Sequence, residues 1–298
     1  MSDSMAHLRR KISTAGDLQS VVRTMKAMAA SSVTQYERSV LALHDYYKTI
    51  ELALSASFRK SDSPPVVGHF ASPPESVIVS AIVFGSDQGL VGQFNDMIAD
   101  YAIEILAGIP GKHEVWAVGE RVHGRLADSG LPLKGLFEVP TSVKGIAPLI
   151  GRILVESITQ RIEDGSTTVY VFHNRPQSRS LYQPSDQRLL PLDRQWQQSL
   201  IKLPWPTKQL PEVLGSGFVT LQSLIHEYMF ISLFRACAES LASENASRLA
   251  AMQRADKNID ELLETLRTAF HRQRQGSIDE ELFDVVSGFE ALSSTHPK

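Results

Sequence analysis

VTQYERSVLALHDYYKTIELAL is the stretch over residues 33–54, and it indicates one long helix. Its apolar residues recur at alternating spacings of three and four, at Val33, Tyr36, Val40, Leu43, Tyr47, Ile50 and Leu54. This repeat is typical of the seam of a coiled coil, where two helices bury one apolar stripe each. Upstream, the apolar face continues less strictly, through Leu8, Ile12, Leu18, Val22 and Met25.

A matching stripe lies near the other end of the chain. It has the same spacing, at Met252, Ala255, Ile259, Leu262, Leu266 and Ala269, with further members at Leu221, Ile225, Tyr228, Leu241 and Leu249. A long helix with one apolar stripe needs a partner for that stripe, and the other end of the chain is the nearest candidate. We therefore expect an antiparallel coiled coil of the two ends. The alternative is ordinary packing of both helices onto a compact helical domain.

Proline divides the chain into three parts. The first proline is Pro64, and none lies between Pro211 and Pro297. Proline interrupts helices, because it lacks an amide donor and clashes with the preceding turn. The expected domains are therefore an N-terminal coiled-coil helix over 1–60, a globular domain over 75–195 and a C-terminal coiled-coil helix over 211–292.

The middle of the chain alternates between strand and helix patterns. Expected strands are 77–84, 114–118, 136–139, 167–173 and 188–192, and expected helices are 94–106, 121–127 and 146–162. Residues 174–186 are polar and are expected to form a loop. Alternation of this kind predicts a doubly wound, mostly parallel sheet, so the fold class is α/β with a long antiparallel coiled coil.

Composition narrows the function. The net charge of −3 gives no global field that would call for nucleic acid or anionic lipid as a partner. The single cysteine, Cys237, excludes an intrachain disulfide and fits a reducing compartment. No apolar run reaches the roughly 18 residues that span a bilayer, and Met1 to Leu8 lack the pattern of a secretory signal.

The sequence offers no clear catalytic or cofactor site. The loop Gly85 to Gly92 follows a strand and precedes a helix, but it matches neither phosphate-binding glycine motif, and Asp87 would repel a phosphate. The histidines have no zinc-binding spacing, and Cys237 has the surroundings of a buried, inert thiol. We therefore expect no catalytic residues, no cofactor, no metal and no direct nucleotide binding.

Four motifs, in order, carry a resemblance to a known family. They are Leu8-Arg9-Arg10-Lys11-Ile12 followed by residues 22–31 (VRTMKAMAAS), residues 85–95 (GSDQGLVGQFN), residues 239–252 (ESLASENASRLAAM), and residues 274–288 (RQGSIDEELFDVVSG). Together they resemble gamma subunits of F-type ATP synthases and span nearly the whole chain. Gln88, Val91, Gln93 and Phe289 depart from the family pattern, which indicates a divergent branch, such as an alternative or sodium-linked complex.

The resemblance implies a non-catalytic rotor shaft. It implies one such chain inside a ring of three alpha and three beta subunits, with its foot on the c ring of the membrane sector and the epsilon subunit alongside. Ion flow would turn the shaft, and the shaft would change the conformations of the beta subunits. The expected location is the cytoplasmic face of the cell membrane. Two other hypotheses are a non-rotary coiled-coil scaffold with an α/β head and a small-molecule enzyme that uses the α/β middle.

The resemblance also implies which residues contact partners. The expected interface with the alpha–beta ring consists of Met25, Lys26, Gln88, Val91, Glu244, Arg248, Arg274, Gln275, Asp279, Leu282, Val286 and Phe289. If Met25 lies near Arg248, antiparallel counting at equal rise ends the first helix opposite Leu266. Beyond that point the chain would present an apolar tip without an intrachain partner, which the resemblance seats in the sleeve at the crown of the ring.

Overall fold

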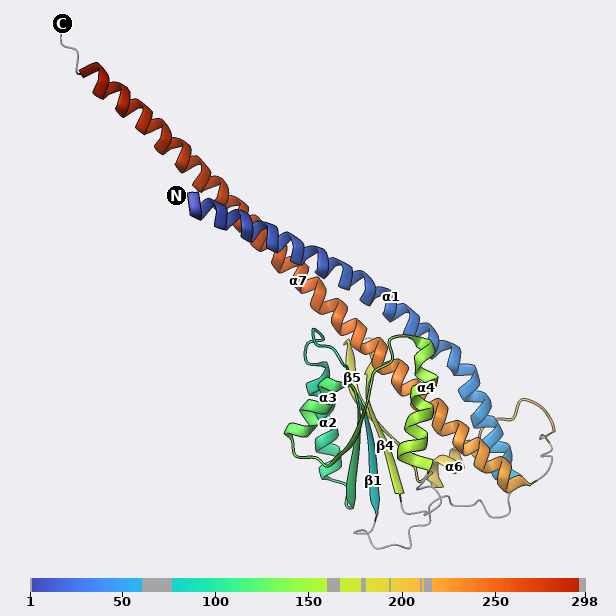
Figure 1. The fold of residues 1–298 in the computed structure, drawn as a ribbon. Helices are drawn as coiled ribbons and strands as arrows, with labels where there is room; N and C mark the ends of the chain where they lie inside the picture. The colour runs from blue at the N-terminus through green and yellow to red at the C-terminus, as the bar shows by residue number, and fades with distance from the viewer. Residues whose placement is uncertain are drawn as a thin grey trace. The chain divides into compact units, whose positions relative to one another are not determined.

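The structure is a computed structural model that describes residues 2–60, 77–159, 167–177, 181–192, 194–209, 211 and 216–294. Along the chain, one long helix precedes the strands and shorter helices and a second long helix follows them (Figure 1). Helix α1 spans Ser2–Lys60 and helix α7 spans Gly217–Ser294. Both helices therefore form where the apolar stripes predict them, and the predicted fold class is confirmed.

The chain divides into two compact units, which we call the arm and the body. The arm comprises Met1–Met28 and Leu249–Lys298, and the body comprises Ala29–Arg248. These units differ from the three predicted ranges, because each long helix contributes to both of them.

The body is built on a five-stranded sheet of order β3-β2-β1-β4-β5. The strands are β1 (Ile78–Phe84), β2 (Lys112–Val118), β3 (Leu133–Phe137), β4 (Thr167–Pro176) and β5 (Tyr182–Leu190). Pairs β1–β2, β1–β4 and β2–β3 are parallel, whereas β4–β5 is antiparallel. A mostly parallel sheet has two faces to bury, and its central strands accordingly have few exposed side chains.

Helices cover both faces of this sheet (Figure 1). On one face lie α2 (Phe94–Ala107) and α3 (Glu120–Asp128), which pack against Val79, Ala81 and Val83. The opposite face packs against α4 (Val143–Ile153) and the body portions of α1 and α7. A π-helix, η2 (Leu154–Thr159), follows α4. Helix α6 (Arg194–Ile201) packs into the same core as α4, α1 and α7.

The apolar stripe of residues 33–54 faces the inside of the body, as its spacing predicts. Tyr36, Ile50 and Leu54 are buried, and Val33, Val40, Leu43 and Tyr47 are partly buried. All of them except Val33 and Leu43 belong to one core with residues of α7 that include Ile225, Tyr228 and Leu241. The stripe is therefore used both for helix pairing and for packing on the sheet.

The prediction of a loop over 174–186 is wrong for most of its length. Strand β4 continues to Pro176, and β5 begins at Tyr182 and pairs with it from Pro176–Tyr182 to Val169–Leu190. The polar composition is compatible with a strand here because β5 lies at the edge of the sheet, where one side of the backbone and many side chains meet solvent.

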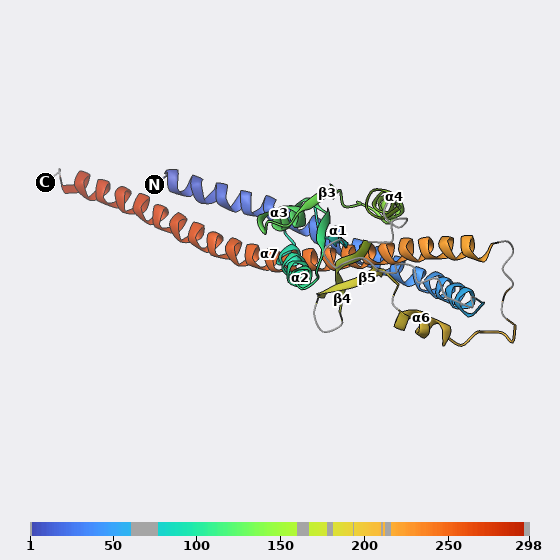
Figure 2. The same cartoon turned by 90° about the horizontal axis from the view of Figure 1, so that it is seen from below.

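In the arm, α1 and α7 run antiparallel, with their N- and C-terminal ends on the same side (Figure 2). An apolar cluster of Ala15, Val22, Met252, Ile259 and Leu263 joins the two helices. The seam differs from the prediction in detail, because Leu18 and Leu262 are 53% and 49% exposed and Ala269 is also exposed. The apolar pattern leaves out Asp256, which belongs to the seam, and therefore assigns exposed neighbours such as Leu262 to the seam instead.

The helices of the arm also overlap further than predicted. The Ser4 hydroxyl lies 3.1 Å from Oε1 of Gln273, and the Arg9 guanidinium lies 5.7 Å from the ring centroid of Phe270. Helix α1 therefore pairs with α7 at least as far as Gln273, and not only to Leu266. The prediction falls short for two reasons: α1 begins at Ser2, before Leu8, and the pairing of Ser4 with Gln273 is displaced by about one helical turn from a pairing of Met25 with Arg248.

Candidate functional site

The loop between β1 and α2 is shaped by its own side chains. A Cβ on Gly85 would lie 2.4 Å from Cβ of Val122, so only glycine allows this approach of the loop to α3. Asn95 accepts a hydrogen bond from the Ser86 amide at 2.9 Å and donates one to the Ser86 hydroxyl at 2.8 Å. The glycine and the polar residues of this motif therefore fix a tight turn.

Asp87 ties this loop to two other segments. Its carboxylate accepts hydrogen bonds from the backbone amides of Glu120, at 3.0 Å, and Val139, at 2.9 Å. Glu120 is the first residue of α3, so the carboxylate also occupies the positive end of that helix dipole. The Asp87 carboxylate thus already accepts hydrogen bonds from the backbone amides that a bound phosphate would need as donors.

Asp87→Ala is expected to destabilise the body by about 2 kcal/mol, because two backbone donors lose their acceptor. Urea denaturation followed by circular dichroism would measure the change. Asp100→Ala is the matched control: its ion pair with Arg125 is exposed, so its loss should cost under about 1 kcal/mol. Equal stability of the two variants would show that Asp87 does not hold the loop.

The far end of the loop is attached to α7. The Ser247 hydroxyl donates to the Val91 carbonyl oxygen at 2.5 Å, and Val91 is only 2% exposed. Nearby, the side-chain amide of Asn174 in β4 donates a hydrogen bond to the backbone carbonyl of Phe94 at 2.9 Å. The backbone carbonyl of Asn174 accepts one from the Ser243 hydroxyl of α7. Loop, strand and long helix are therefore linked by buried hydrogen bonds.

A buried ion pair lies on the same side of α7. Arg248 Nη2 is 2.7 Å from Oε1 of Glu244, and the two side chains are 13% and 7% exposed. Burial raises the pKa of the Glu244 carboxyl, and the charge and hydrogen bond of Arg248 oppose that rise. The pair therefore depends on both of its members, because either charge alone would be desolvated without compensation.

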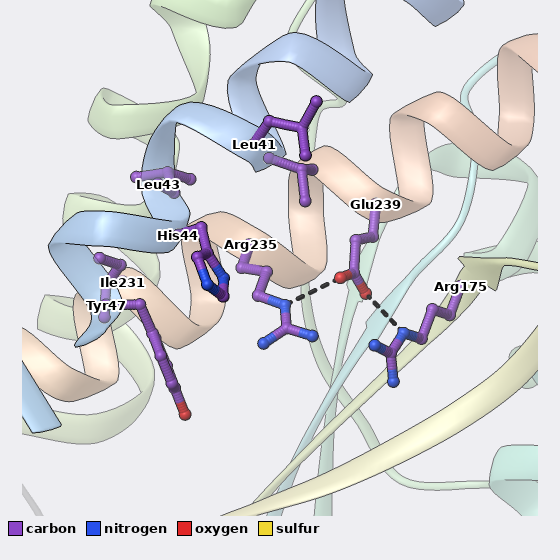
Figure 3. Close-up of a pocket in the computed structure, with 9 residues that line it drawn as sticks. Leu41, Leu43, His44, Tyr47, Arg175, Ile231, Arg235 and Glu239 are labelled. Carbon is purple, nitrogen blue, oxygen red and sulfur yellow. Dashed lines mark hydrogen bonds and ion pairs between the residues drawn. The ribbon is translucent and has the colours of Figure 1, made fainter. Parts of the chain in front are cut away.

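One turn earlier, α7 carries a second buried carboxylate. Glu239 Oε2 lies 2.8 Å from Nε2 of His173 and 3.7 Å from Nε of Arg175, and its Oε1 accepts a hydrogen bond from Arg235 at 2.8 Å. Glu239, Arg175 and Arg235 border a cavity of about 320 Å³ between α1, α7 and the end of β4 (Figure 3). Apolar side chains of α1, including Leu43 and Tyr47, form its other wall.

Glu239 is held in its ionised form. Burial alone would raise the pKa of its carboxyl, but hydrogen bonds and charges from His173 and Arg235 outweigh burial and lower the pKa to about 2. A group with this pKa does not exchange protons near neutral pH, which makes it unsuited to general acid or base chemistry there. Burial also raises the pKa of the Cys237 thiol, so this cysteine is poorly nucleophilic.

The same shift predicts a pH dependence of stability. Because the folded-state pKa of Glu239 lies below the ordinary value of 4.5, its contribution is complete above pH 4.5 and is lost as the pH falls toward 2. The contribution is about 3 kcal/mol at neutral pH. Glu239→Gln should lose most of it, and urea denaturation between pH 3 and 6 should show a shallower pH slope than for Glu280→Gln, an exposed control. Parallel slopes would contradict this role.

Three of the predicted contact residues are largely covered by the chain itself. Val91 and Glu244 are buried, and the Arg248 side chain is 13% exposed. Their chemistry is used to join the loop, the sheet and α7. Gln88 is exposed beside them.

The remaining predicted contacts lie in the arm. Met25 is partly buried on the apolar cluster, and Lys26 pairs with Asp256 at 2.6 Å. Exposed positions on α7 are Arg274, Gln275, Asp279, Leu282 and Val286. Phe289 lies in the helix, but its side chain is outside the described residues. The sequence analysis did not single out Gln19, Arg23 and Asp256. The only sign of them in the sequence is that Gln19 and Asp256 are polar residues at positions of the apolar stripe.

Among the residues that the structure describes, no cluster of three or more His, Cys, Asp or Glu side chains is placed to hold a metal ion. None of the described helices is long and apolar enough to cross a membrane.

Comparison with known proteins identifies relatives along the whole chain. The family described as ATP synthase matches residues 4–292. The ATP synthase gamma chain of Clavibacter sepedonicus is 29% identical over 297 residues, covering 96% of this chain and 97% of that one. That of Leifsonia xyli is 28% identical over 299 residues, with 97% of each covered. Among solved structures, a chain of the Euglena gracilis mitochondrial ATP synthase superposes with a TM-score of 0.61 at 14% identity, over 99% of this chain and 96% of that chain.

Proposed function

We propose a function for this chain from its family, because it belongs to the gamma chains of F-type ATP synthase. It acts as the central rotor shaft that couples ion flow through a membrane ring to ATP synthesis or hydrolysis in the beta subunits. The chain is non-catalytic in this role: nucleotide chemistry belongs to beta, and each orientation of the shaft favours one beta conformation by differential contact.

The observation that supports this proposal best is the continuity of α7. This one helix of 78 residues contributes to both the body and the arm, and so does α1 with 59 residues. Twist can pass along a helix, since its backbone hydrogen bonds link each turn to the next. In the body, α7 is also hydrogen-bonded to strand β4 through Ser243 and to the β1–α2 loop through Ser247.

The proposed partners follow from this role. They are the alpha and beta subunits around the arm, and the epsilon subunit and the c ring at the body. The chain would then lie at the cytoplasmic face of the cell membrane as a peripheral part of the complex. Gln88, Arg274, Gln275 and Asp279 are exposed polar candidates for contact with the ring, and Met25 is a partly buried one.

A rotation assay tests the proposal. The chain would be co-expressed with the alpha and beta subunits of its source, and the complex would carry a bead on a cysteine that replaces the exposed Glu104 of α2. We expect co-purification and unidirectional rotation on addition of ATP. A complex that assembles and hydrolyses ATP without any bead rotation would instead support a non-rotary scaffold, and a chain that does not assemble would contradict both.

A further inference from the structure

The seam of the arm contains a polar layer. Gln19 of α1 and Asp256 of α7 are each only 9% exposed, and they lie among the apolar residues Ala15, Val22, Met252, Ile259 and Leu263. In the phase of the seam, each occupies a position where an apolar side chain is the usual choice. A buried polar layer of this kind loses hydrogen bonds to water, so its contacts within the chain decide whether it is tolerated.

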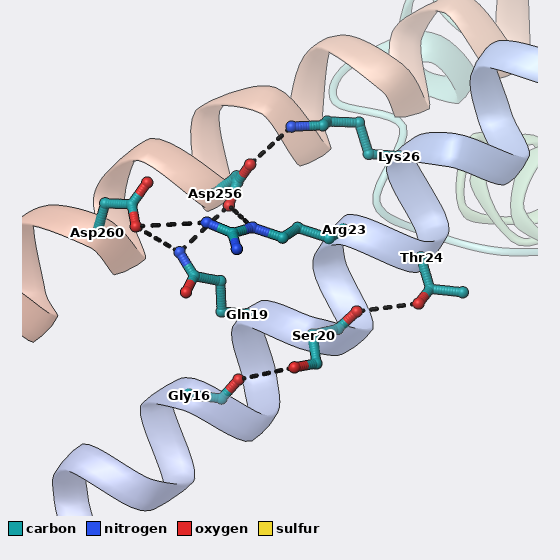
Figure 4. A network of polar contacts seen from close by, with 8 residues as sticks. All are labelled: Gly16, Gln19, Ser20, Arg23, Thr24, Lys26, Asp256 and Asp260. Carbon is teal, nitrogen blue, oxygen red and sulfur yellow. Dashed lines mark hydrogen bonds and ion pairs between the residues drawn. The ribbon is translucent and has the colours of Figure 1, made fainter.

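Those contacts converge from α1 on two carboxylates of α7 (Figure 4). Asp256 accepts hydrogen bonds from Gln19 at 3.3 Å, from Arg23 Nε at 3.1 Å and from Lys26 at 2.6 Å. Asp260 accepts one from Gln19 at 2.5 Å and lies 3.6 Å from Arg23 Nη2. Hydrogen bonds from Lys26 and Arg23 lower the pKa of the Asp256 carboxyl, so this group carries its charge near neutral pH.

The apolar residues beside it do not exclude a displaced pairing by themselves. The cluster mixes the short side chains of Ala15, Ala251 and Ala255 with larger ones, such as Val22, Ile259 and Leu263. If α1 slid along α7 by one turn, about 5 Å, this part of the seam would again set apolar side chains against apolar side chains. Asp256 would instead leave Lys26 and Arg23 and face apolar side chains, which is costly for a charge.

We propose that Gln19 and Asp256, with Arg23 and Lys26, form a lock that fixes the axial alignment of the two helices in the arm. Asp256 and Gln19 act as positioning residues, since they oppose sliding of α1 along α7 and keep the two helices aligned when the arm is twisted. The alignment of the arm is a property of the chain itself and does not depend on the proposed rotary role.

Distance measurements between spin labels test the lock in the full-length chain. Labels on Lys11→Cys and Arg254→Cys would sit on exposed positions of α1 and α7, while the buried thiol of Cys237 stays unreactive. Because Arg9 lies over Phe270, Arg254 is about 20 Å from Lys11 along the arm, so sliding changes the distance between these labels almost fully. We expect one narrow distance distribution for this reference chain. Asp256→Leu should add a second population displaced by about 5 Å, one helical turn, with helicity unchanged, because an apolar substitute suits the seam without defining its alignment.

Matched variants separate a lock from general stability. Glu264→Leu makes the same type of change at an exposed position of α7 and should keep the narrow distribution. Lys26→Glu combined with Asp256→Lys restores an ion pair and should narrow the distribution again. Asp256→Asn serves as a second variant if Asp256→Leu loses helicity, and it should broaden the distribution to a smaller extent. A single narrow distance in both Asp256 variants would overturn the proposal, whether or not the chain drives rotation.

Discussion

Ending the chain after Ser277 is expected to lower its affinity for the alpha–beta ring more than about a hundredfold, while the body stays folded. The deleted stretch of α7 exposes five large apolar side chains, at Ile278, Leu282, Phe283, Val285 and Val286. If a sleeve in the ring buries only two of them, at about 1.5 kcal/mol each, the loss already exceeds a factor of about a hundred. An apolar sleeve also suits rotation, since no directional hydrogen bonds have to break at each step.

The measurement is ATP-driven ion pumping by the reconstituted complex, together with the yield of the chain in that complex. Asp279→Ala with Asp284→Ala is the matched control, because it alters polar residues of the same tip and leaves the apolar ones in place. The sheet of the body, residues 78–190, should keep its thermal unfolding transition, since it lies in the other unit. If the truncated chain assembles and pumps as well as the intact one, the tip is not a bearing.

The sequence predicts the large elements of this fold because their signals are repeated many times. Seven apolar residues in heptad phase specify the body portion of α1, and an error at one position cannot change the outcome. The strands of the sheet are found for a similar reason, since buried parallel strands are short apolar runs. Local polar stretches lack this redundancy, and so the sequence predicts a loop over the first part of β5, up to Asp186, and a strand only at its end.

The candidate site was less predictable, because its roles depend on burial. Asp87, read from sequence, is an acid that opposes phosphate; its actual partners, the amides of Glu120 and Val139, come from segments 33 and 52 residues away. Glu244 and Arg248 stand out by motif and were therefore expected to contact partners. Their spacing of four on a helix would equally predict an ion pair with each other. Only the packing around α7 decides between the two.

Breaking that ion pair is the second change with a large expected effect. Arg248→Met should destabilise the body by about 3–5 kcal/mol, because Glu244 would keep its buried position without a compensating charge. Burial already raises the pKa of Glu244, so loss of Arg248 should raise it further. Protonation of Glu244 removes the uncompensated charge. The loss of stability caused by Arg248→Met should therefore be smaller at low pH than at high pH. Urea denaturation at pH 5 and pH 8 measures both effects.

The double variant Glu244→Gln with Arg248→Met decides what the pair is for. It removes both charges at once, so no uncompensated charge remains, and most of the lost stability should return. If the pair serves only to hold α7 in the body, a complex built with this double variant should pump ions almost normally. If pumping stays low although stability has recovered, Arg248 contributes to coupling beyond its bond to Glu244, which is the role that the family resemblance gives to this residue. A double variant as unstable as Arg248→Met would show that the charges are not paired in the folded chain.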